Sequence, residues 1–156
     1  MASILVDTGP LVALFDASEQ AHNAVVQALA NLTRTDRLFT SLAVVTEVTH
    51  LLDFSVRKQL EFLQWVELGA LTIEPITPQD FPALRTLMQR YTNLPMDFAD
   101  ATLVLLAERL GSQKILTLDR RDFTVYRTAV PMRRLTVKLS RASVSGIGWS
   151  DWLSQG

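Results

Sequence analysis

Short runs of strand-forming residues alternate along this chain with longer segments of helical periodicity. The strand-like runs cover residues 3–7, 37–40, 71–76 and 114–119, and segments with helical spacing of apolar residues fill the intervals. Strands that are separated by helices pair in parallel through right-handed crossovers. The alternation therefore predicts an α/β fold, a three-layer α/β/α sandwich with a central, mainly parallel sheet.

Start and stop signals divide the helical segments from the strands. Pro10 follows the first strand at a position suited to the first turn of a short helix. Ser41 follows the second strand and is placed to cap the helix after it. Gly69 and Gly111 each close a helix. We expect helices over residues 10–15, 18–32, 42–52, 55–68, 78–91 and 97–110.

The composition favours one compact domain. A chain of 156 residues, 48% of them hydrophobic, is long enough to bury one sizeable core. We expect residues 1–130 to form the main domain and residues 131–156 a C-terminal extension, a strand plus a tail packed on that domain. The sequence shows neither a signal-peptide pattern nor an apolar run near about 18 residues. It predicts a soluble cytoplasmic protein that does not bind a membrane.

Acidic residues stand where strands end and helices begin. Asp7 and Asp119 each end a predicted strand, and Glu47 lies in the second turn of the helix after the second strand. Asp97 and Asp100 are three residues apart at a helix start and share one face. Ligands of open parallel sheets bind beyond the carboxyl ends of the strands. We therefore expect acids from four separate segments to converge at this edge.

Gathered carboxylates repel one another unless a cation neutralises them. The chain contains no cysteine, so a bound metal must have oxygen or histidine ligands. Oxygen ligands alone favour Mg²⁺ or Mn²⁺. One or two such ions can polarise a phosphodiester and lower the pKa of a bound water. His22 and His50 do not have a metal-binding spacing, and we assign them no catalytic role.

Four motifs in this order carry a family resemblance. "ILVDTGPLVAL", a glutamate in "TEVTHLL", "DFADATLVLLAERL" and "ILTLDRRDF" resemble the PIN domain, especially the VapC-type toxins of bacterial toxin–antitoxin pairs. The resemblance covers about residues 3–126. It implies a metal-dependent endoribonuclease (a hydrolase of phosphodiester bonds) that cuts single-stranded RNA or structured RNA loops and leaves 5′-phosphate and 3′-hydroxyl ends. It also implies a homodimer and a cognate antitoxin as partners.

The resemblance assigns roles to individual residues. It makes Asp7, Glu47, Asp100 and Asp119 the four catalytic acids, which hold Mg²⁺ or Mn²⁺ as the cofactor. Asp7 and Asp100 are the best candidates for direct ligands, and Glu47 and Asp119 complete the cluster. Thr117 matches the hydroxyl residue of the family's T-x-D step. Asp97 is an additional acid that competes with Asp100 for the third position.

Each acid also has a plain structural interpretation. Asp7 can cap the helix that follows it, and Asp97 and Asp100 can be the N-cap and N3 acids of one helix. For Asp97 we favour capping. Glu47 can form a salt bridge with an arginine, since a glutamate among aliphatic residues needs a partner. Asp119 can lie in a solvated turn.

Basic residues follow the last predicted strand. With a formal net charge of −1, a nucleic-acid partner must be held by a local patch. Arg120, Arg121, Arg133 and Arg134 are candidates for phosphate contacts, although a solvated surface explains them equally well.

Two other classes of protein compete with the nuclease. A PIN-fold module can bind RNA or a protein without cutting, although all four acids are intact. A phosphoacceptor receiver domain shares the α/β layout, but it requires paired acids after the first strand and an acid after the third. This chain has a single aspartate after the first strand, and "LTIEPI" ends without an acid, so the receiver domain ranks low.

Overall fold

The computed structural model describes residues 2–94, 96–119 and 133–134. Within them the chain alternates strands and helices, as the sequence predicts. In chain order the elements are β1 (Ser3–Val6), α1 (Thr8–Phe15), α2 (His22–Ala30), β2 (Arg37–Ser41), α3 (Leu42–Leu51), α4 (Val56–Glu67), β3 (Thr72–Glu74), the 3₁₀ turn η1 (Pro78–Asp80), α5 (Phe81–Arg90), α6 (Phe98–Leu110), β4 (Lys114–Leu116) and β5 (Arg133–Arg134).

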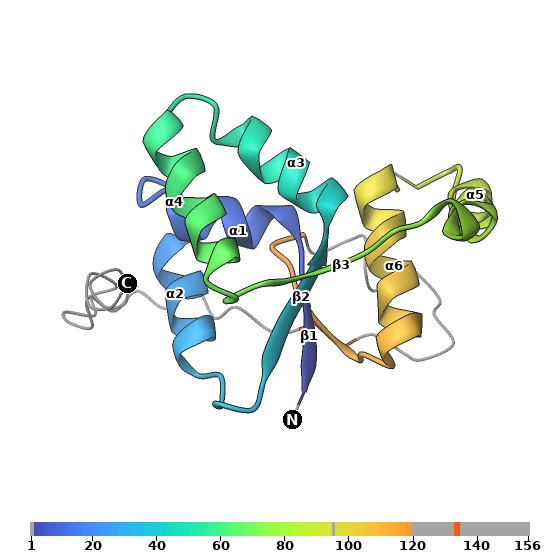
Figure 1. Cartoon of the computed structure of the whole chain (residues 1–156), viewed down its shortest axis with the longest axis horizontal. Helices are drawn as coiled ribbons and strands as arrows, with labels where there is room; N and C mark the ends of the chain where they lie inside the picture. Colours follow the sequence, from blue (N-terminus) through green and yellow to red (C-terminus); the bar gives the residue numbers. More distant parts are fainter. Residues whose placement is uncertain (1, 95, 120–132, 135–156) are drawn as a thin grey trace.

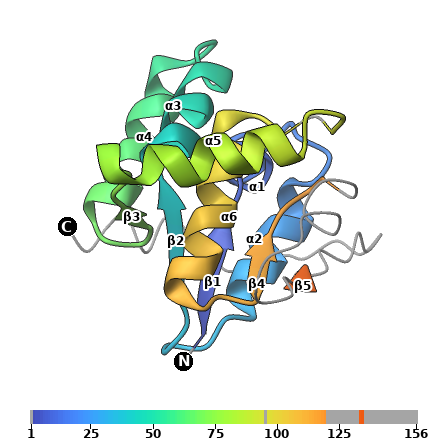
Figure 2. The ribbon, with the colours of Figure 1, turned by 90° about the vertical axis from the view of Figure 1, so that its right-hand side faces the viewer.

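All strands of the sheet run parallel, in the order β3-β2-β1-β4-β5 (Figure 2). The central strand β1 is apolar on both faces, and Ile4, Leu5 and Val6 are at most 1% exposed. Leu5 pairs with Phe39 of β2 on one side and with Ile115 of β4 on the other. A strand buried on both faces reads as a continuous aliphatic run, which explains "SILV".

Helices cover both faces of the sheet (Figure 1). On one side α1 packs against α2, α3 and α4, and on the other α6 contacts β1 and β2 and carries α5 on its outer surface. The first side contains an aromatic cluster, in which the Phe15 ring meets Phe62 and Trp65 edge-on at centroid distances of 5.5 and 5.7 Å. The second side is filled by α6 residues such as Leu103 and Leu106, both fully buried. The predicted three-layer sandwich is confirmed.

Every helix differs from its predicted bounds by at least one residue, and α1 begins at Thr8, two residues before its predicted start. The helix expected over residues 18–32 begins only at His22, because Asp16 ends α1 and accepts hydrogen bonds from the amide and hydroxyl of Ser18. These bonds fold residues 17–21 into turns instead of a helical turn. The segment over residues 78–91 starts with one 3₁₀ turn before α5, and Thr77 and Asp80 form the expected capping box.

The predicted C-terminal extension falls mainly outside the described residues. Its first part contributes β5, which pairs in parallel with β4. The division at residue 130 stays a prediction. Among the described residues, no helix is both long and apolar enough to cross a membrane.

Candidate active site

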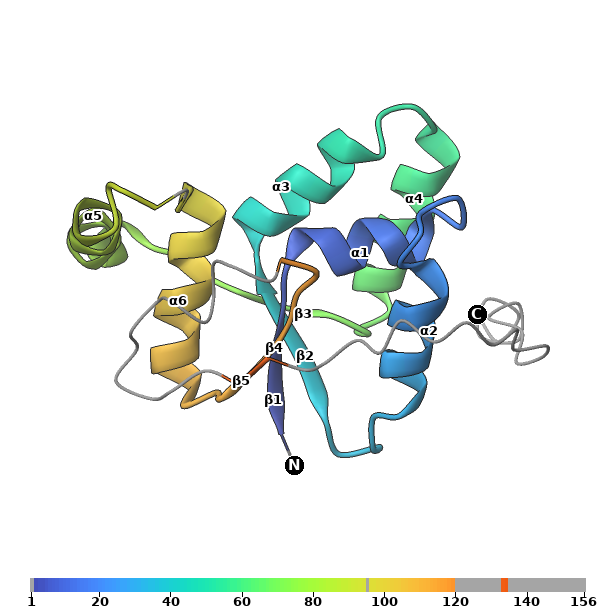
Figure 3. The same ribbon diagram turned by 180° about the vertical axis from the view of Figure 1, so that it is seen from behind.

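The candidate site lies at the carboxyl edge of the sheet. There β1 leads into α1 and β2 into α3, and α6 begins at the same edge (Figures 1 and 3). The first helical turns present backbone N–H groups and positive dipole ends, which favour carboxylates nearby. The topology thus brings the predicted acids to one end of the molecule.

Asp7 is anchored by three hydrogen bonds. Its amide donates to the carbonyl of Leu116 at 3.0 Å, which extends the β1–β4 ladder by one residue. Its Oδ1 accepts from the amide of Thr8 at 2.7 Å, and its Oδ2 accepts from the hydroxyl of Thr117 at 2.8 Å. Asp7 is therefore the N-cap of α1 and directly follows the carboxyl end of β1. Capping and a ligand role are compatible for this residue.

Thr117 and Asp119 form one small turn after β4. The fully buried Thr117 hydroxyl donates to Asp7 and accepts from the amide of Asp119 at 3.1 Å. Asp119 is exposed. The spacing of two residues lets the Thr117 hydroxyl bind both Asp7, which follows the neighbouring strand, and the amide of Asp119. This explains in physical terms why a threonine precedes the aspartate by two positions in the T-x-D step.

Glu47 points toward α1 from the middle of α3. The hydroxyl of Thr8 donates to its Oε2 at 2.6 Å. The predicted alternative, a salt bridge to arginine, is not formed within the described part of the chain. Ser41 caps α3 as predicted, and its hydroxyl also pairs with that of Thr102 in α6 at 2.7 Å. This buried pair fixes the start of α3 against α6.

Asp97 and Asp100 form a reciprocal capping box at the start of α6. Asp97 Oδ1 accepts from the amide of Asp100 at 2.8 Å, and Asp100 Oδ2 accepts from the amide of Asp97 at 3.2 Å. The predicted cap is confirmed for both residues. Asp97 has a second role, because its negative charge acts on Asp7 and Glu47.

The electrostatics show that these acids interact. Burial is the main cause that raises the pKa of Asp7, and the charges of Asp97 and Asp119 raise it further against the hydrogen bonds from Thr117 and Thr8. Burial likewise raises the pKa of Glu47 most, with added repulsion from Asp97 and Asp7 and an opposing hydrogen bond from Thr8. Carboxylates from four segments therefore repel one another when they are ionised, and a bound cation would offset that cost.

The donor set suits a hard cation, but the side chains do not form a closed cage. Within residues 2–94 and 96–119, no three acidic or histidine side chains are grouped tightly enough to surround an ion. Mg²⁺ commonly retains several waters and takes only one or two carboxylates from the protein. An open arrangement of oxygen donors at a sheet edge is compatible with that mode of binding.

Other predicted residues lie outside the acid cluster or outside the described structure. Arg120 and Arg121 are among the residues that are not described, and Arg133 and Arg134 form β5 beside β4. Their phosphate contacts stay a prediction. His22 contacts the carbonyl of Ala13 through Nδ1 at 2.6 Å, a structural contact.

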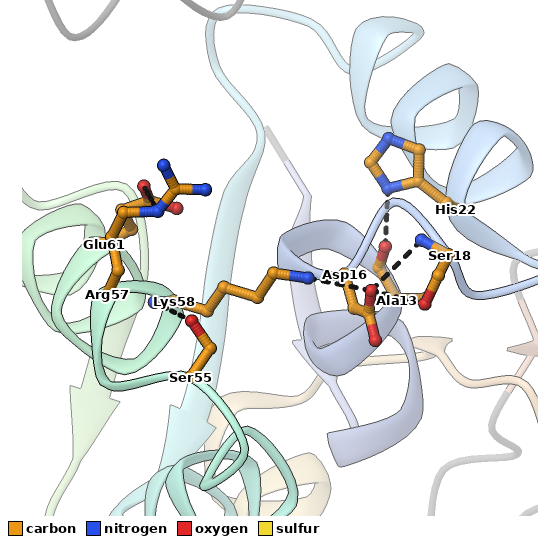
Figure 4. A network of polar contacts seen from close by, with 8 residues as sticks. All are labelled: Ala13, Asp16, Ser18, His22, Ser55, Arg57, Lys58 and Glu61. Carbon is orange, nitrogen blue, oxygen red and sulfur yellow. Dashed lines mark hydrogen bonds and ion pairs between the residues drawn. The ribbon is translucent and has the colours of Figure 1, made fainter.

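A second polar network lies at the far end of α1 (Figure 4). Lys58 of α4 reaches Asp16 at 2.9 Å and also lies 5.1 Å from the ring centroid of Phe54. Hydrogen bonds from Ser18 and Lys58 lower the pKa of Asp16 to about 2. This network ties α1 to α4 and is separate from the site edge.

Thr8 is a site residue that the sequence motifs do not predict. Its hydroxyl holds Glu47 and its amide holds Asp7. The only sequence signal for this role is a hydroxyl residue directly after the acid that follows β1. Its hydrogen-bond partner, Glu47, lies 39 positions away, and no local pattern links the two residues.

Comparison with known proteins identifies the class. The PIN domain family model matches residues 4–129, and the chain belongs to the PIN domain family. The resemblance read from the four motifs, including its VapC-type character, is therefore confirmed.

Individual relatives are of the VapC type. The chain is 32% identical over 126 residues to ribonuclease VapC26 of Mycobacterium tuberculosis, which covers 80% of this chain and 92% of that protein. Its fold is similar to that of M. tuberculosis VapC20, a toxin that cleaves the sarcin–ricin loop (TM-score 0.68, 22% identity, 76% of this chain and 91% of that chain). It is also similar to a structure of VapBC2 from Rickettsia felis bound to a promoter DNA fragment (TM-score 0.63, 13% identity, 85% and 98%).

Proposed function

We propose that this protein is a metal-dependent endoribonuclease that cuts single-stranded RNA or exposed RNA loops, as the toxin of a toxin–antitoxin pair. One structural observation supports the proposal in addition to the family membership. Asp7 follows β1, Asp119 lies in the turn after β4, Glu47 lies in the middle of α3 and Asp97 caps α6, and the charges of Asp97 and Asp119 both raise the pKa of Asp7. The 32% identity to a VapC ribonuclease supports the same activity.

The proposed chemistry divides the acids by role. Asp7 and Asp100 would hold Mg²⁺ or Mn²⁺, and Glu47 and Asp119 would complete the donor set or orient water. When bound, the ion supplies charge for the phosphodiester and a water of lowered pKa. Thr117 keeps Asp7 in place through its 2.8 Å hydrogen bond, so that this acid does not turn away from the edge when it is ionised.

The proposed partners follow from the solved relatives. VapBC structures from Rickettsia felis and Haemophilus influenzae pair a toxin with its antitoxin, and both share this fold. We infer a cognate antitoxin and a homodimer for this chain, and action in the cytoplasm.

A cleavage assay tests the activity. The purified chain with Mg²⁺ should cleave single-stranded RNA and leave 5′-phosphate ends. We expect Asp7→Asn and Asp100→Asn each to reduce the rate by more than about 100-fold, since even indirect partners of a metal are worth 10–100-fold. Asp53→Asn is the matched control, because this exposed acid after α3 carries the same charge away from the site. Equal rates in all three variants would refute the assignment.

A PIN-fold module that binds RNA or a partner without cutting is the second candidate. It is favoured by one observation, that the described acids do not form a preassembled cage. Calorimetric titration with Mn²⁺ separates the two functions. Heat that is lost in Asp100→Asn supports the nuclease, whereas no heat in the wild type supports the module.

A further inference from the structure

One threonine links two partly buried acids from different segments of the chain, Asp7 after β1 and Glu47 in α3. Thr8, the first residue of α1, is only 8% exposed. Its amide donates to Asp7 Oδ1 at 2.7 Å, and its hydroxyl donates to Glu47 Oε2 at 2.6 Å. The two carboxylates are thus bound by the same residue, although they lie on β1–α1 and on α3.

We propose that Thr8 is a positioning residue that holds the carboxylate of Glu47 beside that of Asp7 so that both can bind a divalent cation. The inference rests on the proposed nuclease function and deepens it. It assigns a role to Thr8, for which neither the four motifs nor the T-x-D step implies one.

The chemistry of the donor supports this task. A hydroxyl that donates to a carboxylate forms a short, charge-assisted hydrogen bond, and the 2.6 Å distance is in that range. The bond uses one lone pair of an ionised carboxylate that has about four, so acceptor capacity is left for a cation. Because a hydroxyl carries no charge, it restrains Glu47 without neutralising it. A lysine or arginine at this place would compete with the metal for the same charge.

The packing around Thr8 makes the restraint effective. Glu47 extends from a helix whose flanking residues Val44 and Val48 are fully buried, so the backbone of α3 cannot shift to find another partner. Repulsion from Asp97 and Asp7 acts on the Glu47 carboxylate. Without the Thr8 hydroxyl, the remaining freedom of this side chain is rotation away from the other acids, toward solvent.

Thr117 provides an internal comparison for Thr8. It acts on the other oxygen of Asp7 in the same way, as a buried neutral hydroxyl that donates at 2.8 Å. The Asp7 carboxylate therefore has two donors, the Thr8 amide and the Thr117 hydroxyl, whereas Glu47 depends on Thr8 for its hydroxyl donor. Loss of Thr8 should thus change the position of Glu47 more than that of Asp7.

The test measures Mn²⁺ affinity of the full chain by calorimetry. Thr8→Val keeps the shape and removes the hydroxyl, and we expect it to weaken Mn²⁺ binding by about 10-fold or more. Thr8→Ser keeps the hydroxyl and should restore the wild-type affinity. Thr40→Val is the matched control, because the Thr40 hydroxyl is also buried but donates to the carbonyl of Val6. Its Mn²⁺ affinity should equal that of the wild type.

A second measurement asks whether the effect passes through Glu47. Urea unfolding without metal gives the stabilities of Thr8→Val, Glu47→Ala and the double variant, and a hydrogen-bonded pair should show non-additive losses. In cleavage assays, Thr8→Val should need more Mn²⁺ for half-maximal rate but recover much of the rate when Mn²⁺ is saturating.

The outcomes distinguish this inference from the proposed function. If the wild type binds Mn²⁺ and Thr8→Val binds it equally well, Thr8 is not a positioning residue and the nuclease proposal survives. Additive stability losses for Thr8 and Glu47 overturn the inference in the same way. If the wild type neither binds Mn²⁺ nor cleaves RNA, the proposed function itself fails, and the metal-positioning role fails with it.

Discussion

The hydroxyl of Thr117 donates a 2.8 Å hydrogen bond to Oδ2 of Asp7, which lies 110 residues earlier in the chain. This bond joins the end of β4 to the end of β1. The same hydroxyl accepts from the amide of Asp119. One buried oxygen atom thus fixes the relative positions of two of the four proposed catalytic acids.

Thr117→Val should weaken the site and shift its pH dependence. The hydrogen bond from Thr117 lowers the pKa of Asp7 against its burial, so its removal should raise that pKa further. We expect the cleavage rate to require higher pH and the folded state to lose about 1–3 kcal/mol. The pH–rate profile and urea unfolding measure these changes, with Thr117→Ser as the control that keeps the hydroxyl. A profile that matches the wild type would contradict this role.

The elements with strong local signals in the sequence are found in the structure. The aliphatic run at residues 3–6 could only be a strand buried on both faces, and Ser41 and Gly111 mark helix ends that the structure reproduces. The start of α2 was predicted four residues too early, because the turn over residues 17–21 depends on Asp16, whose other partner Lys58 is 42 positions away.

Contacts between distant segments are the part of the site that the sequence does not predict. The sequence predicted that Asp7, Glu47 and Asp97 would share an edge, because parallel topology alone brings strand ends together. It could not predict that Glu47 bonds to Thr8 or that Ser41 pairs with Thr102, since these bonds depend on how α3 packs on α1 and α6. Side-chain direction follows from packing, which motif spacing does not encode.

Glu47→Gln should stabilise the metal-free protein at neutral pH. The raised pKa of Glu47 means that the folded state binds more protons than the unfolded state above pH 4.5, so this group's contribution to stability falls as pH rises through the raised pKa. A glutamine removes that loss, because its amide oxygen can still accept from Thr8 and its NH₂ can donate to Asp97.

Urea unfolding between pH 4 and 8 in a chelator measures this change. The wild type should lose stability relative to Glu47→Gln as the pH rises, and the difference should vanish near pH 4. Asp53→Asn, which removes one negative charge from an exposed position after α3, is the matched control. A constant difference at all pH values would show that ionisation of Glu47 is not its cause.

Lys58→Met should make the protein more sensitive to acid. The hydrogen bond from Lys58 is the second cause, after that from the Ser18 hydroxyl, of the low Asp16 pKa of about 2. A lowered pKa stabilises the folded state above pH 3.8, and this contribution is lost as pH falls toward 2. The variant should raise the Asp16 pKa and shift acid unfolding to higher pH.

Carboxyl NMR titration and acid unfolding followed by circular dichroism test the Lys58 prediction. Arg57→Met is the control, since it removes the same charge from the adjacent position, where Arg57 makes only an exposed contact with Glu61 at 3.5 Å. We expect this control to unfold like the wild type. Identical acid midpoints for both variants would mean that Lys58 does not hold Asp16.

Two glycines should respond in opposite ways to alanine. Gly9, in the first turn of α1 beside the site, has a negative φ, and an added Cβ would lie 3.5 Å from the Leu118 side chain, an ordinary contact. Gly9→Ala should therefore stabilise the fold by about 0.4–1 kcal/mol, because it reduces the freedom of the unfolded chain. Gly111 ends α6 at a φ of 60°, with no atom of the described residues within 4 Å of an added Cβ. Gly111→Ala should cost about 1–2 kcal/mol through backbone strain alone. Urea unfolding compares the two, and a loss of stability in Gly9→Ala would show that the turn after Asp7 tolerates no side chain.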